Sequence, residues 1–341
     1  MLFPFAEVWW VYALFVAFVL GMLALDLGIF HRHAREVGVR EAAFWSAFWI
    51  SLAVVFGAGL YFFSLDWFAR EGALAAFPHL TPQSAARQVT LEFATGFLVE
   101  KSLAVDNLFV FIVIFNYFAI PPVYQYRVLF WGIIGALVFR SIFIALGAAL
   151  MQFHSVVILF GVFLIFTGMK LVFSREEPRD LEQNRVFRLL RRVLPVWPRL
   201  EGQRFFVRQS GVLHATPLLV ALCFIEVSDI VFAVDSVPAI FALTREPFIV
   251  FTSNIFAILG LRALFLLVAK IMPQMHYLKF GLAGVLVFVG LKMVWLNQKF
   301  GGQFPIAWSL GIIAVLIGGS LALSWLLPAR GHACREGEKA S

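Results

Sequence analysis

The sequence predicts an all-α, polytopic membrane protein with about nine transmembrane helices, and its composition and its long apolar stretches carry that prediction. Of the 341 residues, 62% are hydrophobic and 14% are charged. A typical soluble domain has roughly 45–50% apolar residues and about 25% charged residues. Too few polar residues are present to cover a water-soluble fold. Amphipathic alternation over about ten residues does not recur, which argues against an outer-membrane barrel.

Apolar stretches of about 20 residues, the length of a helix that crosses a bilayer, recur along the chain. Nine spans are expected, at residues 8–30, 42–64, 90–115, 128–150, 155–173, 216–243, 247–268, 278–296 and 306–327. The N-terminus has no basic region, and Glu7 precedes the first apolar run, so the first helix is expected to remain in the protein rather than to be a cleaved signal peptide. We therefore treat residues 1–341 as one transmembrane domain.

The longest polar connection, residues 175–211, predicts the orientation of the chain. It holds nine arginines and five acids, and the positive-inside rule places such a loop in the cytoplasm. By alternation, eighteen lysines and arginines then lie inside and four outside, with the N-terminus outside and the C-terminus cytoplasmic. The net charge of +7 is thus an orientation signal and does not indicate a nucleic-acid partner. The loop is expected to contact anionic lipid headgroups.

Two parts of the chain resemble each other. FLIFTGMKLVF (163–173) matches VLVFVGLKMVW (285–295), and the thirty-residue step from Arg140 to Lys170 recurs from Arg262 to Lys292. EKSLAVDN (100–107) and EVSDIVFAVDS (226–236) share Glu-x-Ser followed by Ala-Val-Asp. These matches predict a duplicated three-helix unit.

Each predicted unit has an odd number of spans, so adjacent copies must have opposite orientations in the membrane. We expect a 3+3 inverted repeat, with residues 89–174 as the first unit, the basic cytoplasmic loop at 175–211, and residues 212–297 as the second unit. Residues 298–341 would form the last helix and a cytoplasmic tail. In transporters built this way, the substrate site lies near the midplane, where the repeats meet.

Acidic side chains in the spans predict a cation site. An ionisable group within a span costs about 2.5–3.5 kcal/mol on insertion scales and marks a functional site. The predicted spans contain six carboxylates and three central cations, Lys101, Arg140 and Arg262. If all are ionised, the spans carry a formal excess of three negative charges, which a bound divalent cation would reduce. The six are Asp26, Glu100, Asp106, Glu226, Asp229 and Asp235.

Helix geometry bears on how these acids could share one site. At about 100° per residue, Glu226 and Asp235 project to opposite sides of a straight helix, and Glu100 and Asp106 differ by about 120°. We therefore expect local unwinding or a kink between the members of each pair, as in broken transporter helices. The alternative is that opposite faces serve different purposes, with one acid paired to Arg140 or Arg262 and the other facing the transport path.

The available ligands are oxygen atoms. Carboxylates, serine hydroxyls and the amide of Asn107 suit magnesium, calcium or manganese(II), whereas zinc and copper favour imidazole or thiolate. None of the seven histidines lies in the middle of a span, and the two cysteines, Cys223 and Cys334, are far apart in sequence. The predicted ligands of a transported metal are Glu100, Asp106, Asn107, Glu226, Asp229 and Asp235, and no resident cofactor is expected. Asp26 could join the site or pair with Arg32, and Lys101 could fill the empty site or pair elsewhere.

These motifs resemble the TerC family of integral membrane proteins. The resemblance rests on residues 100–111, 226–244, 247–265 and 276–293, and on ALDLGIFHR near the start of the chain. It implies a bacterial inner (plasma) membrane protein related to small inverted-repeat exporters. For some members it implies manganese(II) efflux carried by the acids of the two Asp-bearing motifs, here Glu100, Asp106, Glu226, Asp229 and Asp235. Older family labels imply tellurium-ion resistance or membrane redox modulation.

The leading hypothesis is a secondary transporter that exports divalent metal cations, with manganese(II) as the expected ion. The alternative is tellurium-ion resistance, or a membrane-bound redox or stress modulator that acts through partners docked on the cytoplasmic loop. A membrane enzyme is not expected, because no constellation of nucleophile, base or cofactor motif accompanies the carboxylates. The oligomeric state is left open.

Overall fold

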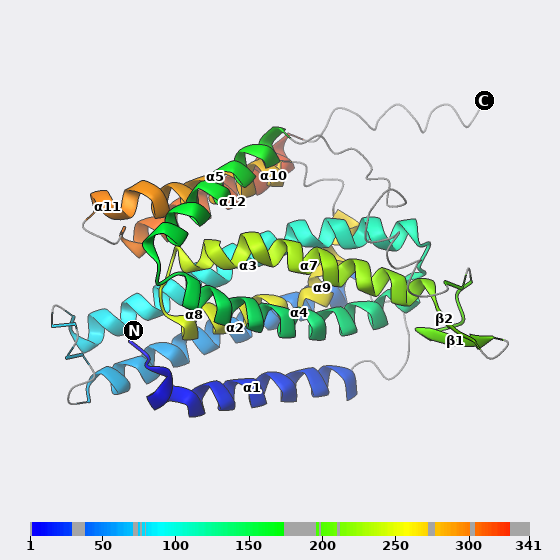
Figure 1. Ribbon diagram of the computed structural model, residues 1–341, viewed down its shortest axis with the longest axis horizontal. Helices are drawn as coiled ribbons and strands as arrows, with labels where there is room; N and C mark the ends of the chain where they lie inside the picture. The colour runs from blue at the N-terminus through cyan, green and yellow to red at the C-terminus, as the bar shows by residue number, and fades with distance from the viewer. Residues whose placement is uncertain are drawn as a thin grey trace.

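The computed structural model describes residues 2–28, 38–70, 74–75, 77–78, 80–173, 196–197, 199–209, 212–271, 277–300 and 304–327, excluding the side chains of residues 25–28, 106, 270 and 271. Its helices lie side by side in two groups (Figure 1). The helices are α1 (Phe5–Gly28), α2 (Val39–Phe68), α3 (Pro82–Tyr117), α4 (Pro122–Leu150), α5 (His154–Phe173), α7 (Pro217–Phe241), α8 (Pro247–Ile258), α9 (Leu261–Ile271), α10 (Leu278–Leu291), α11 (Asn297–Lys299) and α12 (Ile306–Leu326), with a π-helical segment η3 (Lys292–Leu296) after α10.

Local sequence explains where several of these helices begin. Proline, whose missing N–H is no loss in the first turn of a helix, opens α3, α4, α7 and α8. At α3, the Thr81 side chain accepts a hydrogen bond from the Ser84 amide, and the Ser84 hydroxyl accepts one from the Thr81 amide. This reciprocal capping fixes the start of a 36-residue helix.

Seven helices of the described chain are long and apolar enough to cross a bilayer, or eight if α8 and α9 form one bent span. Helix makes up most of the described part of each of the nine predicted stretches, but α3 is not among these eight spans. It carries Glu92, Glu100, Lys101 and Asp106, which lower its mean hydropathy. The structure therefore confirms an all-α membrane protein, and nine crossings remain a prediction.

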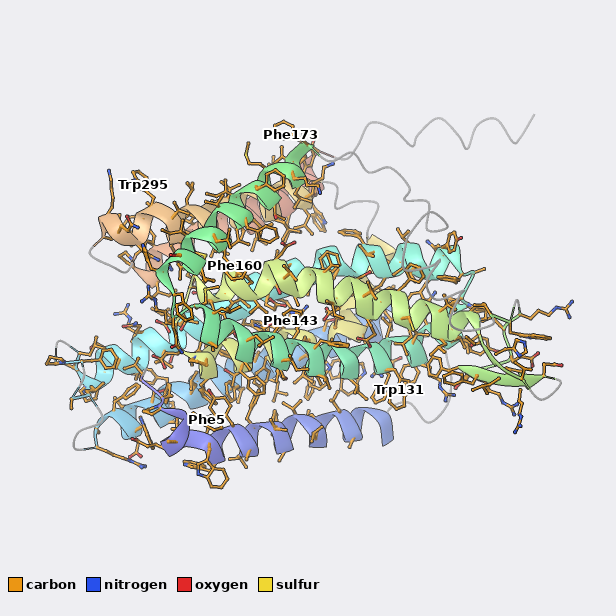
Figure 2. The ribbon with its side chains drawn as sticks, viewed as in Figure 1. Phe5, Trp131, Phe143, Phe160, Phe173 and Trp295 are labelled. Atoms are coloured by element: carbon orange, nitrogen blue, oxygen red, sulfur yellow. The ribbon has the colours of Figure 1, made fainter. Side chains whose placement is uncertain are left out.

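Large apolar side chains cover the outside of the bundle. Leu14, Val54, Phe62 and Phe166 are each about two-thirds exposed, and Figure 2 shows Phe5, Phe173 and Trp295 on the outer surface. Exposed apolar patches of this extent are unusual on soluble monomers. Lipid chains are the solvent that suits this surface.

Each group contains helices from both predicted units. In the first group α3 packs on α8 and α4 packs on α7, with α2 against α3 and α9, while in the second group α5 and α12 flank α10. Figure 1 shows α5, α10 and α12 together on one side of the molecule. α1 lies along the first group, where Phe15 contacts Phe56 of α2 and Phe256 of α8.

The helix break lies elsewhere than the sequence predicts. α3 and α7 are continuous through Glu100–Asp106 and Ser228–Asp235, so the expected unwinding there is wrong. The break falls between α8 and α9, which are bent by 46°. Gly260 makes this turn with a φ of 76°, and its α-carbon lies so close to Trp49 that an added Cβ would approach the indole to 2.5 Å.

A small hairpin lies outside the helices. Strands β1 (Phe206–Gln209) and β2 (Val212–Ala215) pair antiparallel, with Phe206 opposite Ala215. They belong to the end of the basic connection, and most of that connection lies outside the described residues. Its expected contact with lipid headgroups therefore stays a prediction.

Candidate functional site

Arg140 of α4 is the centre of a polar group buried among four helices. Its side chain is 3% exposed. It forms an ion pair with Glu100 of α3 and donates two hydrogen bonds to Asp229 of α7, from Nε at 3.3 Å and from Nη2 at 3.0 Å. Nη1 also lies 3.2 Å from Oδ1 of Asn254 on α8. One guanidinium thus joins two acids and an amide from both predicted units.

Asn254 is held in place by its own helix. Its Nδ2 donates to the carbonyl oxygen of Val250, 3.1 Å away, which leaves Oδ1 to accept from Arg140. The neighbouring Ser253 packs against Gly96 of α3, where an added Cβ would lie 2.9 Å from the serine Oγ. This small residue lets α3 and α8 approach closely, so that Glu100 and Asn254 can reach the same arginine.

Glu226 lies one helical turn before Asp229 on α7, and it is close enough for the two negative charges to interact. Its carboxylate occupies the space above Gly135 of α4, where a Cβ would overlap it. Its Oε2 is buried and accepts no hydrogen bond from any described residue. A buried carboxylate oxygen without a donor is a ready ligand for a cation.

The described charges of this group do not balance. Arg140 contributes +1, and Glu100, Glu226 and Asp229 contribute −3 when ionised, which leaves −2. Fixed negative charge of this size is costly in a membrane-spanning bundle unless it is paired or neutralised. The group could therefore bind a cation with two positive charges.

Lys101 occupies the broken end of α8. Its Nζ donates to the carbonyl oxygens of Ala257 at 3.1 Å and Leu259 at 3.3 Å. Carbonyl oxygens at a helix C-terminus lack intrahelical partners, and the helix dipole there favours positive charge. Lys101 thus pairs with backbone carbonyl oxygens of α8 and the turn after it, rather than with the neighbouring Glu100.

The other predicted ligands lie apart from Arg140 or outside the description. Asp235 faces the opposite side of α7 from Glu226 and interacts with Thr167 and Lys170 of α5. Asn107 is buried within α3. The side chains of Asp106 and of Asp26, in the last turn of α1, lie outside the described residues.

The second interpretation, that the two faces of a straight helix serve different purposes, fits these positions. Glu100 is paired with an arginine, and Glu226 and Asp235 contact different helices. Arg262, the counterpart of Arg140, is buried with its guanidinium 4.6 Å from the ring centroid of Tyr126. Among the described side chains, no three of the His, Cys, Asp and Glu type lie close enough together to hold a metal ion, so a bound cation would also need amide, hydroxyl or carbonyl oxygens.

Sequence reasoning missed a second buried polar group. Glu92 of α3 is 6% exposed and accepts hydrogen bonds from the hydroxyl of Thr244 at 2.5 Å and from Gln88 Nε2 at 2.9 Å. Glu246 accepts from the backbone amides of Leu2 and Phe3. Glu92 lies inside the predicted span 90–115, which was the available signal.

Known proteins resemble the chain over most of its length. The profile of the integral membrane protein TerC family matches residues 85–332. An uncharacterized membrane protein of Myxococcus xanthus is 49% identical over 91% of this chain and 90% of its own length. Proteins with the provisional name membrane-bound redox modulator Alx are 43% identical in Salmonella typhi and 42% identical in Escherichia coli K12, each over 88% of this chain, and over 88% and 89% of their own lengths.

No solved structure matches this chain. The family match covers well over half of the residues and includes every helix that contributes to the Arg140 group. The chain therefore belongs to the integral membrane protein TerC family.

Proposed function

We propose that the protein is a secondary transporter that exports divalent metal cations, manganese(II) first among them, from the cytoplasm across a bacterial inner membrane. The observation that carries this proposal is the buried carboxylate group of Glu100, Glu226 and Asp229 around Arg140. Its oxygen chemistry suits a hard divalent cation, and its charge of −2 is what such an ion would neutralise.

An inverted repeat is part of this proposal, and the contact between α5 and α10 supports it. An added Cβ at Gly290 would lie 2.6 Å from the carbonyl oxygen of Gly161, and one at Gly168 would lie 2.8 Å from the carbonyl oxygen of Ala283. An offset of 122 residues relates Gly161 to Ala283 and Gly168 to Gly290. Exchanging the two units thus turns one contact into the other, as two-fold related halves require.

The packing of the remaining helices agrees with the same exchange. α3 packs on α8 and α4 packs on α7, so that the first helix of each unit contacts the second helix of the other. The Arg140 group lies where these two contacts meet. Transporters with inverted repeats bind their substrates at such a position, beside a broken helix, and α8–α9 is bent there.

Arg140 and Lys101 would act as internal counter-cations in the absence of metal. Arg140 neutralises part of the charge of Glu100 and Asp229, and Lys101 satisfies the carbonyl oxygens at the end of α8. A divalent ion would bind first at Glu226, whose Oε2 accepts no hydrogen bond within the described chain. It would then compete with Arg140 for Asp229.

Uptake of metal by everted membrane vesicles tests this function. Manganese, calcium, magnesium and zinc are compared in parallel, with and without a pH gradient, for the wild type and for Glu226→Gln, with Glu7→Gln as the control. Glu7 is exposed on α1, so its variant should transport like the wild type. We expect Glu226→Gln to reduce manganese uptake at least about tenfold, the loss of one charge-assisted interaction.

Asp235→Asn is the internal comparison, because Asp235 contacts α5 rather than the Arg140 group. Its effect should be smaller than that of Glu226→Gln. Wild-type manganese uptake by a normally inserted Glu226→Gln protein would contradict the proposed site, and absence of uptake of all four metals by the wild type would contradict the proposed function.

The names of the Alx relatives support a second candidate, a redox or stress modulator that acts through partners. Cys223, the one cysteine within the described residues, is half-buried on α7 and Cys334 lies outside them. If redox chemistry at these thiols is the function, then replacing both by serine should abolish resistance to oxidative or tellurium-ion stress while metal uptake is unchanged. Unchanged resistance would reject the thiol-based form of this candidate.

A further inference from the structure

A cavity of about 660 Å³ opens at the end of the bundle where α3 begins. It lies between the α5–α10–α12 group and the remaining helices, and its walls come mainly from α3, the end of α7 and the turn after it, η3 and the start of α12. None of the residues of the Arg140 group lines it. Glu92, the acid that lines the cavity, precedes Glu100 on α3 by eight residues, which corresponds to about 12 Å along the helix.

Cations predominate on the charged part of the wall. Arg87, Arg245 and Lys292 line the cavity together with one acid, Glu92, so that the formal charge of the lining is +2. Arg87 and Arg245 are exposed at the rim, and within the described part of the chain no hydrogen bond or ion pair engages either guanidinium. Two such donors facing one cavity favour an anion.

The buried end of the cavity has polar groups fixed in position. Lys292 is 3% exposed and begins the π-helical segment η3, a distortion that often accompanies functional sites. The two oxygens of Glu92 already accept hydrogen bonds from Thr244 and Gln88. Glu92 is close enough to interact with the charge of Lys292 but does not cancel the two arginines.

We propose that this cavity binds a phosphate group. A phosphate monoester or inorganic phosphate carries about −1.5 to −2 charges at neutral pH, which matches the charge of the lining, and arginine pairs present the donor geometry that phosphate oxygens accept. Much of the remaining wall is apolar, with Leu91, Met151, Phe241 and Met293 among its residues, and polar side chains such as Gln83, Ser84 and Asn297 complete it. The same chemistry therefore fits the headgroup of an anionic phospholipid whose acyl chains follow that apolar wall.

A bound phosphate would join the two groups of helices. Arg87 and Arg245 belong to α3 and to the turn between α7 and α8, whereas Lys292 follows α10 in the other group. The phosphate would thus bridge elements that otherwise meet through few contacts. The cavity shares no residue with the Arg140 group, so phosphate binding can be measured without reference to metal transport.

Binding to the purified, full-length protein tests the proposal with two probes. Inorganic phosphate is titrated by calorimetry into the delipidated protein in neutral detergent, and retention of phosphatidylglycerol is measured by native mass spectrometry after extraction from nanodiscs. The test variant is Arg87→Gln with Arg245→Gln, both exposed positions whose replacement should not prevent folding. The matched control is Arg70→Gln, an exposed arginine paired with Asp66 that does not line the cavity.

Loss of either probe's binding by at least about tenfold in the double variant, with wild-type binding in Arg70→Gln, supports the proposal. Loss of phosphate binding identifies a free oxyanion as the ligand, and loss of phosphatidylglycerol alone identifies a lipid headgroup. Equal binding by wild type and double variant, or binding of neither probe by the wild type, overturns it. Lys292→Met, where it folds, should weaken the same probe.

Discussion

Replacing Arg140 by methionine should be among the most destabilising single changes in this protein. The Arg140 side chain is 3% exposed, and the side chains of its two ion-pair partners, Glu100 and Asp229, are 1% and 5% exposed. Methionine preserves much of the volume but leaves two buried carboxylates without their cation. Removing one partner of a buried ion pair costs about 3–5 kcal/mol, so we expect a loss of at least that order in the free energy of unfolding.

The assay is reversible unfolding in mixed detergent micelles, followed by the fluorescence of the tryptophans. Arg70→Met is the control, because its partner Asp66 is 77% exposed and the Arg70 side chain 59% exposed, and surface pairs contribute about 0–1 kcal/mol. Adding Glu100→Gln and Asp229→Asn to Arg140→Met should recover part of the lost stability, since the orphaned charges are then removed. A loss below about 1 kcal/mol for Arg140→Met would refute the reasoning.

Two glycines and a lysine at close helix contacts allow sharper tests of the packing. Gly290→Val places a Cβ 2.6 Å from the Gly161 carbonyl oxygen and should separate α5 from α10, lowering thermal stability by several degrees, whereas Gly319→Val, with nothing within 4 Å, should not. Gly260→Ala should lower the free energy of unfolding by more than about 1–2 kcal/mol, because it combines a positive φ with a clash against Trp49. The control Gly59→Ala, in α2 with nothing within 4 Å, should stabilise the protein by up to about 1 kcal/mol. An equal effect at both positions would contradict the assigned turn. Lys101→Met leaves the carbonyl oxygens at the end of α8 without their donor, so it should increase hydrogen exchange at residues 257–261, and unchanged exchange there would show that the lysine does not hold this break.

Much of the fold could be predicted from apolar length, because the described part of every predicted span is mainly helical and most of the spans meet the length and hydropathy criteria for a crossing. α3 is the exception among the long helices, because the acids and the lysine that form its buried polar contacts also lower its mean hydropathy. The hairpin β1–β2 was not predicted. Its four-residue strands are too short to give a periodic signal within a basic connection.

The site was predictable as a set of residue types but not as an arrangement. Glu100, Glu226, Asp229 and Arg140 stand out because charge within a span is costly, whereas Asn254 was not among the predicted ligands. The predicted position of the helix break is wrong because the acids do not all face one cavity. α7 instead continues without a break through both acids, Asp235 lies toward α5, and the chain breaks at Gly260, a residue that the acid spacing does not single out.

The most direct test of the central claim is equilibrium binding of manganese(II) to the purified protein, followed by the loss of the electron paramagnetic resonance signal of the free ion. We predict that the wild type and Glu7→Gln bind manganese(II) with similar affinity, and that Glu226→Gln and Asp229→Asn bind it at least about tenfold more weakly. Undiminished affinity in both of these variants, with folded protein, would contradict the assignment of the Arg140 group as the metal site.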